Sequence, residues 1–298
     1  MKLGLFAINY GTCADPEAAI EIARYAESAG FESVWTGEHV VLPSPQPAGF
    51  SMAPTLPFLD TTVALSLLAT HTTTLKLASG IIILPLRHPV LLAKELASID
   101  VVSNGRLIVG VGAGYVREEF AAFGVPIAER NQRMDDSIGA LRALWTMQRP
   151  HHQGQFVSID GIDAHPRPVQ RPGPPIVVGG ESRTALRRAI TTADGWYGFY
   201  LDPPTVRKVV DSLRRLADEH VRPAELGPLE ITVTPSPPID RDTIEQYQEL
   251  GVERLVFLPQ PDAGPDERHR PVPLEQIKRN LDTVEREFAP LLTAQTGS

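Results

Sequence analysis

The sequence has few residues that could build a covalent or metal-bound scaffold. Its 298 residues include one cysteine, Cys13, which excludes disulfide pairs, cysteine-based zinc sites and iron–sulfur clusters. It contains neither an HExxH nor a GxSxG motif, so we expect no metal site and no serine nucleophile. Redox chemistry on this chain would therefore need an organic cofactor.

Excess positive charge and long apolar runs are also lacking. The chain has 28 Lys and Arg against 36 Asp and Glu, a net charge of −8, which argues against nucleic acid as a partner. No apolar run reaches the length of about 18 residues that spans a membrane. The first residues, MKLGLFAINYG, lack the apolar core and cleavage site of a signal peptide. We therefore expect a cytoplasmic enzyme that acts on a small-molecule substrate.

What the sequence does contain is a regular alternation of strand-like and helix-like segments. The predicted strands are 2–8, 33–39, 75–84, 106–114, 176–178, 194–199, 229–234 and 254–259. Helical patterns separate them, with Asp15 and Asp60 placed as N-caps of the first two helices. Eight such repeats predict an α/β fold, a (β/α)8 TIM barrel in a single domain over 1–298. A doubly wound open sheet is the alternative.

Two connections are longer than a plain barrel requires. Residues 40–58 and 149–175 are rich in proline, and we expect both to be insertion loops at the C-terminal face of the strands. The first follows a strand directly and is predicted to form a wall over a ligand. Residues 293–298 are predicted to be a disordered tail.

Paired glycines close the fifth predicted strand. In PPIVVGGESRTALRRA, the apolar run ends at Gly179 and Gly180, and a helix begins just after Ser182. Glycine permits close approach of the backbone to a ligand, and a helix N-terminus attracts anions. The pattern predicts a phosphate site in which Ser182 and Arg183 could assist. The alternative is a tight turn with Ser182 as an ordinary cap.

Two further glycine clusters occur at strand ends. GVGAGY (110–115) fails the dinucleotide fingerprint because Tyr115 occupies the place of the third glycine. It fits either the approach of a flat ring or plain strand packing. The SGI triplet (79–81) places a glycine inside a β-branched strand, which indicates either a bulge near a ligand or a barrel kink.

Titratable side chains follow the second predicted strand. WTGEHV (35–40) places Glu38 and His39 at a strand's C-terminal end, where catalytic residues of barrels lie. Histidine can exchange protons near neutral pH, so His39 is the first candidate for acid–base chemistry. The alternative is a structural histidine.

The chain resembles a known family in three blocks. These are LPLRHPVLLAKELASIDVVSNGRLIVGVGAGYVREEFAAFGVP, ERNQRMDDSIGALRALW and PPIVVGGESRTALRRAITTADGW. They are similar to the luciferase-like flavin and deazaflavin oxidoreductases, in the branch that uses coenzyme F420. The resemblance covers residues 1 to 200; beyond that only the barrel rhythm continues.

The resemblance implies a cofactor ring at the C-terminal mouth of the barrel. The ring would rest on a bulge, often with a non-proline cis peptide, at Ser79, Gly80 and Ile81, and His39 would lie close to it. The cofactor-binding residues it implies are Ser79, Gly80, Ile81, Gly112, Ala113, Gly114, Val178, Gly179, Gly180, Glu181 and Ser182. Some relatives carry a glutamate as proton donor where this chain has Tyr115. Glu118 and Glu119 follow, but REEF is equally typical of a solvated helix start.

Together these features predict an oxidoreductase that transfers a hydride between coenzyme F420 and an unidentified organic substrate. His39 and Glu38 are the predicted catalytic residues, and the resemblance implies a homodimer. An FMN-dependent luciferase-like monooxygenase is the first alternative. A phosphate-binding barrel without redox chemistry, or a flavin-binding protein without catalysis, is the second.

Overall fold

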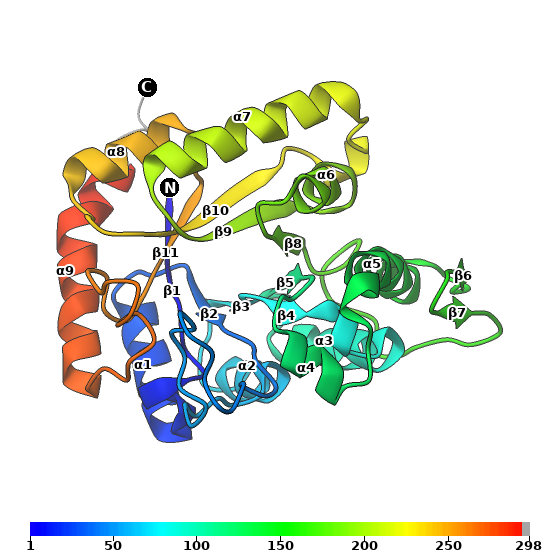
Figure 1. Ribbon diagram of the computed structural model, residues 1–298, viewed down its shortest axis with the longest axis horizontal. Helices are drawn as coiled ribbons and strands as arrows, with labels where there is room; N and C mark the ends of the chain where they lie inside the picture. The colour runs from blue at the N-terminus through cyan, green and yellow to red at the C-terminus, as the bar shows by residue number, and fades with distance from the viewer. Residues whose placement is uncertain (294–298) are drawn as a thin grey trace.

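Eight parallel strands close into a barrel (Figure 1). The structure is a computed structural model that describes residues 1–293, with side chains described through residue 288. The barrel strands are β1 (Lys2–Leu5), β2 (Ser33–Thr36), β3 with β4 (Lys76–Ser79 and Ile82–Ile83), β5 (Leu107–Gly112), β8 (Ile176–Gly179), β9 (Gly195–Leu201), β10 (Glu230–Pro235) and β11 (Arg254–Phe257). Each pairs in parallel with its neighbours, and pairing of β3 with β5 closes the ring. The predicted TIM barrel is confirmed, and the open sheet is wrong.

Helices cover the outside of this barrel. They are α1 (Pro16–Ser28), α2 (Thr61–Ala69), α3 (Pro89–Val102), α5 (Arg130–Thr146), α6 (Arg183–Thr192), α7 (Pro203–Glu219), α8 (Arg241–Glu249) and α9 (Leu274–Thr293), with the short α4 (Arg117–Ala122) after β5. The predicted caps are present, since Asp15 and Asp60 accept hydrogen bonds from first-turn N–H groups. Apart from Thr293, which ends α9, the predicted tail 293–298 lies outside the described residues. No described helix is long and apolar enough to cross a membrane.

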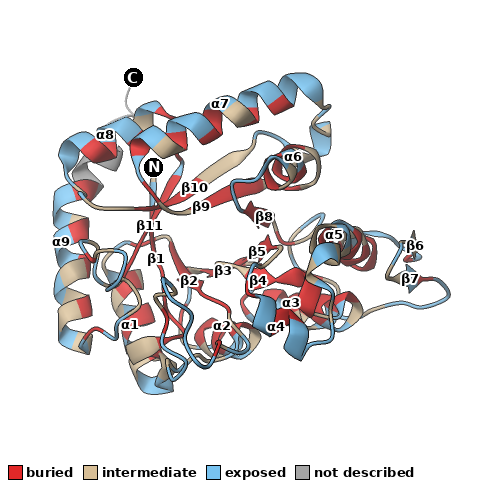
Figure 2. Ribbon diagram, in the orientation of Figure 1, coloured by how far each residue is buried: buried red, intermediate tan, exposed pale blue. Residues whose placement is uncertain are grey.

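The strands are buried on both faces, as parallel strands are when helices cover them (Figure 2). Outward-facing residues pack against the helices, and inward-facing residues form a second cluster inside the barrel. The rings of Trp35 and Tyr197, from β2 and β9, stack inside it with their centroids 5.2 Å apart. At the N-terminal end of the barrel, the buried Arg254 pairs with Glu32 and Glu230. This end is therefore closed by packing and ion pairs.

The third strand is interrupted between β3 and β4. The Gly80–Ile81 peptide bond there is cis, which confirms the non-proline cis peptide expected within 79–81. The neighbouring strand β5 carries two glycines because the bulge leaves no room for a side chain there. A Cβ on Gly110 would lie 1.9 Å from the carbonyl oxygen of Ser79, and one on Gly112 would lie 1.9 Å from Cδ1 of Ile81. Packing against the bulge therefore explains why these two positions are glycine, without reference to any ligand.

The two insertions lie at opposite ends of the barrel. Residues 40–58 follow β2 at its C-terminal end, as predicted. Residues 149–175 instead connect α5 to β8, so they lie at the N-terminal ends of the strands, and the predicted placement at the other face is wrong. This second insertion contains an antiparallel hairpin, β6 (His152–Gln153) with β7 (Ser158–Ile159), that projects beside α5 (Figure 1).

Glu27, on α1, holds the connection between α2 and β3. Its Oε1 accepts hydrogen bonds from the backbone N–H groups of Thr73, Thr74 and Leu75 at 2.9, 2.5 and 2.9 Å. Partial burial acts to raise the pKa of Glu27, but these donors outweigh it and lower the pKa to about 2.

The lowered pKa predicts a pH-dependent contribution to stability. Because the folded-state pKa lies below that of the unfolded chain, the stabilisation is present above the unfolded value and is lost as pH falls through the folded one. Glu27→Gln is expected to lower the urea midpoint at pH 7, by an amount that shrinks as pH falls from about 5 to about 2. A difference that stays constant with pH would contradict this role.

Candidate active site

A large cavity opens at the C-terminal mouth of the barrel. Its volume is about 470 Å³, within the usual range of small-molecule sites. Of the residues predicted for the site, Glu38, His39, Gly80, Ile81, Gly114, Gly179, Gly180 and Glu181 line it. Ser79, Gly112, Ala113, Val178 and Ser182 do not. The structure therefore gathers residues from all four predicted segments, 38–39, 79–81, 112–114 and 178–182, around one hollow.

The first insertion forms one side of this cavity. Phe50, Met52 and Phe58 line it, together with Gly49 and Ser51. Aromatic side chains from the barrel strands face them, notably Phe6 just after β1 and Phe199 on β9. The cavity is thus largely aromatic, which suits a flat organic ring.

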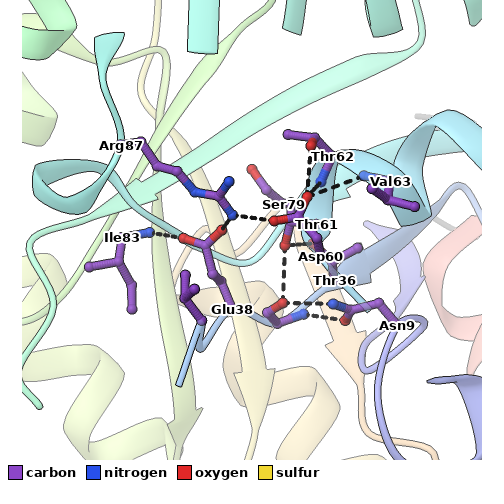
Figure 3. A network of polar contacts seen from close by, with 12 residues as sticks. Asn9, Thr36, Glu38, Asp60, Thr61, Thr62, Val63, Ser79, Ile83 and Arg87 are labelled. Atoms are coloured by element: carbon purple, nitrogen blue, oxygen red, sulfur yellow. Dashed lines mark hydrogen bonds and ion pairs between the residues drawn. The ribbon is translucent and has the colours of Figure 1, made fainter. Parts of the chain in front are cut away.

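Glu38 is held in an ion-pair network (Figure 3). Its Oε1 accepts a hydrogen bond from Nη2 of Arg87 at 2.5 Å, and its Oε2 accepts one from the backbone N–H of Ile83 at 2.5 Å. Arg87 also pairs with Asp60, the N-cap of α2, at 2.6 Å. Burial raises the pKa of the Glu38 carboxyl, and Arg87 opposes that shift. Each carboxylate oxygen accepts one hydrogen bond, so Glu38 anchors β4 and Arg87 at the wall of the cavity.

Asn9 fixes the end of β2 that carries these residues, and no local sequence pattern predicts this contact. Its side-chain amide donates to the carbonyl of Gly37 at 2.9 Å and accepts from the Gly37 N–H at 2.8 Å (Figure 3). Asn9 is fully buried. This paired contact sets the direction in which Glu38 and His39 leave the strand.

His39 is oriented by a buried carboxylate from α4. Its Nδ1 lies 3.2 Å from Oε2 of Glu119, whose Oε1 accepts the backbone N–H of Val40 at 2.7 Å. Since an ionised carboxylate only accepts hydrogen bonds, Nδ1 carries the proton and Nε2 is the nitrogen free to face the cavity. The solvated interpretation of REEF is therefore wrong for Glu119, which is fully buried, although Glu118 is exposed.

The glycine turn before α6 has the tight geometry and the Ser182 cap of one predicted interpretation, and the phosphate site stays a prediction. Gly180 has φ of +111°, a conformation that side chains rarely allow, and its carbonyl accepts from the indole N–H of Trp196. The hydroxyl of Ser182 accepts from the N–H of Ala185 at 3.2 Å, so Ser182 acts as an ordinary cap. Arg183 pairs with Glu219, outside the cavity. Any anion here would bind the remaining backbone N–H groups of the first helical turn.

Ser79 has its hydroxyl satisfied by the neighbouring strand. The hydroxyl donates to the carbonyl of Gly110 at 2.8 Å and accepts from the Gly110 N–H at 2.8 Å. It therefore fixes the bulge from behind, while Gly80 and Ile81 form the cavity surface.

Sequence reasoning missed the segment between β11 and α9, residues 258–273. Arg268 and His269 from this segment line the cavity, beside Tyr10. Burial first, and then the charge of Arg268, lower the pKa of His269 to about 4. The described residues contain no cluster of His, Cys, Asp and Glu that could hold a metal ion.

Comparison with known sequences shows the family to which this chain belongs. A sequence model of luciferase-like monooxygenases matches residues 1–290. An uncharacterised protein of Mycobacterium tuberculosis is 30% identical over 273 residues, which cover 88% of this chain and 91% of that protein. The oxygenase component of a flavin-dependent trigonelline monooxygenase of Acinetobacter baylyi is 34% identical over 161 residues, 53% of this chain and 41% of that protein. The chain belongs to the luciferase-like monooxygenase family, whose members are oxidoreductases.

Solved structures share the fold at lower identity. Monooxygenase RslO1 from Streptomyces bottropensis superposes with a TM-score of 0.76 at 20% identity, covering 98% of this chain and 99% of that one. The coenzyme F420-dependent tetrahydromethanopterin reductase from Methanopyrus kandleri superposes with a TM-score of 0.73 at 17% identity, with the same coverage. At these identities the likeness establishes the barrel and its closure.

Proposed function

We propose that this protein transfers a hydride between coenzyme F420 and a small organic substrate. The observation that carries the proposal is one aromatic cavity that extends from Gly80–Ile81 to Gly179–Gly180 and has His39 on its wall. If the coenzyme ring lies on Ile81, the phosphate-bearing chain attached to the ring can extend to the N-terminus of α6. The residues present thus fit a deazaflavin in both its apolar and its anionic part.

The chain's own residues have three tasks in this proposal. The aromatic side chains of the cavity walls would pack against the ring, and Gly80 and Ile81 would support one of its faces. The bound coenzyme would supply a two-electron hydride transfer. His39, held by Glu119, offers Nε2 to accept or return the accompanying proton, which is the arrangement used by oriented histidines in acid–base catalysis.

An FMN-dependent monooxygenase is the second candidate. The identity to the flavin-dependent trigonelline monooxygenase favours it. Oxygen chemistry on a reduced flavin calls for a site that excludes water. Here the rim is open, since Val40, Val41 and Tyr115 are 44%, 43% and 66% exposed. Because deazaflavins react poorly with oxygen, this open rim favours F420.

Paired equilibrium binding separates the two candidates. Purified protein is titrated with F420 and with FMN, and fluorescence reports the bound fraction. We expect F420 to bind in the micromolar range or below and FMN to bind at least about tenfold more weakly. A preference for FMN, with oxygen uptake in the presence of reduced FMN, would replace the proposal by the monooxygenase. Failure of both to bind would contradict a flavin site of either kind.

Gly180→Ala tests the phosphate part of the site. A side chain at a φ of +111° strains the turn and displaces the first N–H groups of α6. We expect FMN or F420 to bind about tenfold more weakly, and riboflavin, which lacks the phosphate, to change little. Gly161→Ala is the matched control, because Gly161 also has positive φ but lies in open space away from the cavity. An equal loss for FMN and riboflavin would argue against a phosphate at this turn.

A further inference from the structure

The cavity contains a cation that the proposed hydride transfer does not use. Arg268 is the only lysine or arginine among the described residues that line it. Its Nε donates to Nε2 of His269 at 3.2 Å, and its guanidinium carbon lies 4.7 Å from the ring centroid of Tyr200 and 5.7 Å from that of Phe199. The guanidinium is therefore stacked on two aromatic rings at the wall of the cavity.

Arg268 has no carboxylate partner within the described part of the chain, unlike Arg254 and Arg87 at the two ends of the barrel. Arg254 pairs with Glu32 and Glu230, and Arg87 pairs with Glu38 and Asp60. Arg270, two residues on from Arg268, pairs with the adjacent Glu267. A guanidinium that faces a largely apolar cavity without a counter-ion favours an anion as its ligand.

The surrounding contacts hold Arg268 in place. The Tyr200 hydroxyl donates to the carbonyl of Ala263 at 2.7 Å, and Asn280 donates to the carbonyl of Pro259 at 2.7 Å, so the 258–273 segment is fixed to β9 and α9. Because Arg268 donates to Nε2 of His269, the proton of that neutral ring lies on Nδ1, which is 3.3 Å from the Tyr10 hydroxyl. Tyr10 then accepts from His269 and keeps its own hydrogen for a ligand.

We propose that Arg268 binds a carboxylate of the organic substrate and that the substrate's apolar or aromatic body lies against Phe6, Phe58 and Phe199. The inference rests on the proposed function and specifies its substrate class. A carboxylate matches the planar fork of one guanidinium, with the Tyr10 hydroxyl as an additional donor. A phosphate dianion is disfavoured because the described residues that line the cavity include no second lysine or arginine.

Binding of matched acid and amide pairs tests the inference. The probes are benzoate and benzamide, phenylacetate and phenylacetamide, and 3-phenylpropanoate and 3-phenylpropanamide. Each is titrated by calorimetry into the wild-type protein with and without saturating coenzyme. We expect at least one acid to bind about tenfold or more tightly than its amide, since hydrogen bonds to charged groups are worth that factor.

Substitutions of Arg268 test whether this side chain causes the preference for the acid over the amide. Arg268→Gln is expected to remove the preference for the acid, and Arg268→Lys to retain part of it, because lysine keeps the charge without the fork. Arg270→Gln removes the same charge from the same segment outside this cavity and is expected to leave the preference intact. Circular dichroism and thermal midpoints establish that all variants fold.

The coenzyme titrations separate this inference from the proposed function. The dissociation constants of F420 and FMN for Arg268→Gln should stay within about twofold of wild type. A loss of coenzyme affinity as large as the loss of acid binding would make Arg268 a coenzyme contact and overturn the inference. So would a preference for the acid that survives Arg268→Gln, or the absence of any preference in all three pairs. If the wild type binds no coenzyme but prefers acids, the proposed function fails and the anion subsite stands.

Discussion

Replacing His39 with alanine is expected to lower kcat about 100-fold or more, with little change in coenzyme affinity. His39 lines the cavity with its Nδ1 held by Glu119, and a positioned general acid or base contributes about that factor. The measurement is steady-state turnover across pH, with a substrate identified by oxidation of reduced coenzyme. The variant should also lose one limb of the wild-type pH profile. Full turnover with an unchanged profile would remove His39 from the chemistry.

Glu119→Gln probes the same pair without removing the histidine. The amide replaces one acceptor oxygen by a donor, so it either loses the Val40 N–H bond or forces the His39 proton to the other nitrogen. We expect turnover to fall about tenfold or more, as it does when the tautomer of a catalytic histidine is disturbed. Nitrogen NMR shifts of His39 report the tautomer without any substrate. Glu118→Gln, at the exposed neighbour, is the control and should change neither quantity.

Gly110→Ala is expected to destabilise the fold more than any other substitution considered. Its Cβ would lie 1.9 Å from a backbone atom, the Ser79 carbonyl oxygen, which cannot move aside as a flexible side chain can. Overpacking of this kind costs about 3 kcal/mol or more in free energy of unfolding. Urea denaturation and the thermal midpoint provide the measurement.

Gly264→Ala is the matched control for this substitution. Gly264 has no heavy atom within 4 Å of a built Cβ, and its φ lies outside the positive range. We expect its effect to stay within about 0.5 kcal/mol. If Gly110→Ala were equally harmless, the tight bulge between β3 and β4 would be contradicted.

Local sequence signals predicted most of the barrel because its strands and caps are locally encoded. Asp15 and Asp60 begin α1 and α2 as predicted, and the apolar stripe of α9 is buried through Ile277, Leu281, Val284 and Phe288. The predicted third strand, 75–84, is divided in the structure because Gly80–Ile81 bulges into the space left by glycines on β5. The second insertion follows helix α5 and precedes strand β8, so it lies at the N-terminal ends of the strands. Its proline content, on which the prediction rests, carries no information about the end of the barrel.

The candidate site was predictable only where its residues lie at strand ends. His39 and Gly179 carry that signal. Glu119 pairs with a residue 80 positions earlier in the chain, and Arg268 lies in a connection with no regular pattern. Such partners become visible only when the barrel closes and brings the strand ends together. The predicted homodimer, the cytoplasmic location and the single-domain extent stay predictions.

The most direct test of the account is a crystal structure of the protein with F420. We expect the deazaflavin ring in van der Waals contact with Ile81, and a phosphate oxygen about 3 Å from a backbone N–H in the first turn of α6. His39 Nε2 should face the ring, and Arg268 should remain free of the coenzyme. A coenzyme bound outside the barrel mouth would contradict the proposed function, and a coenzyme phosphate bound at Arg268 would contradict the anion subsite.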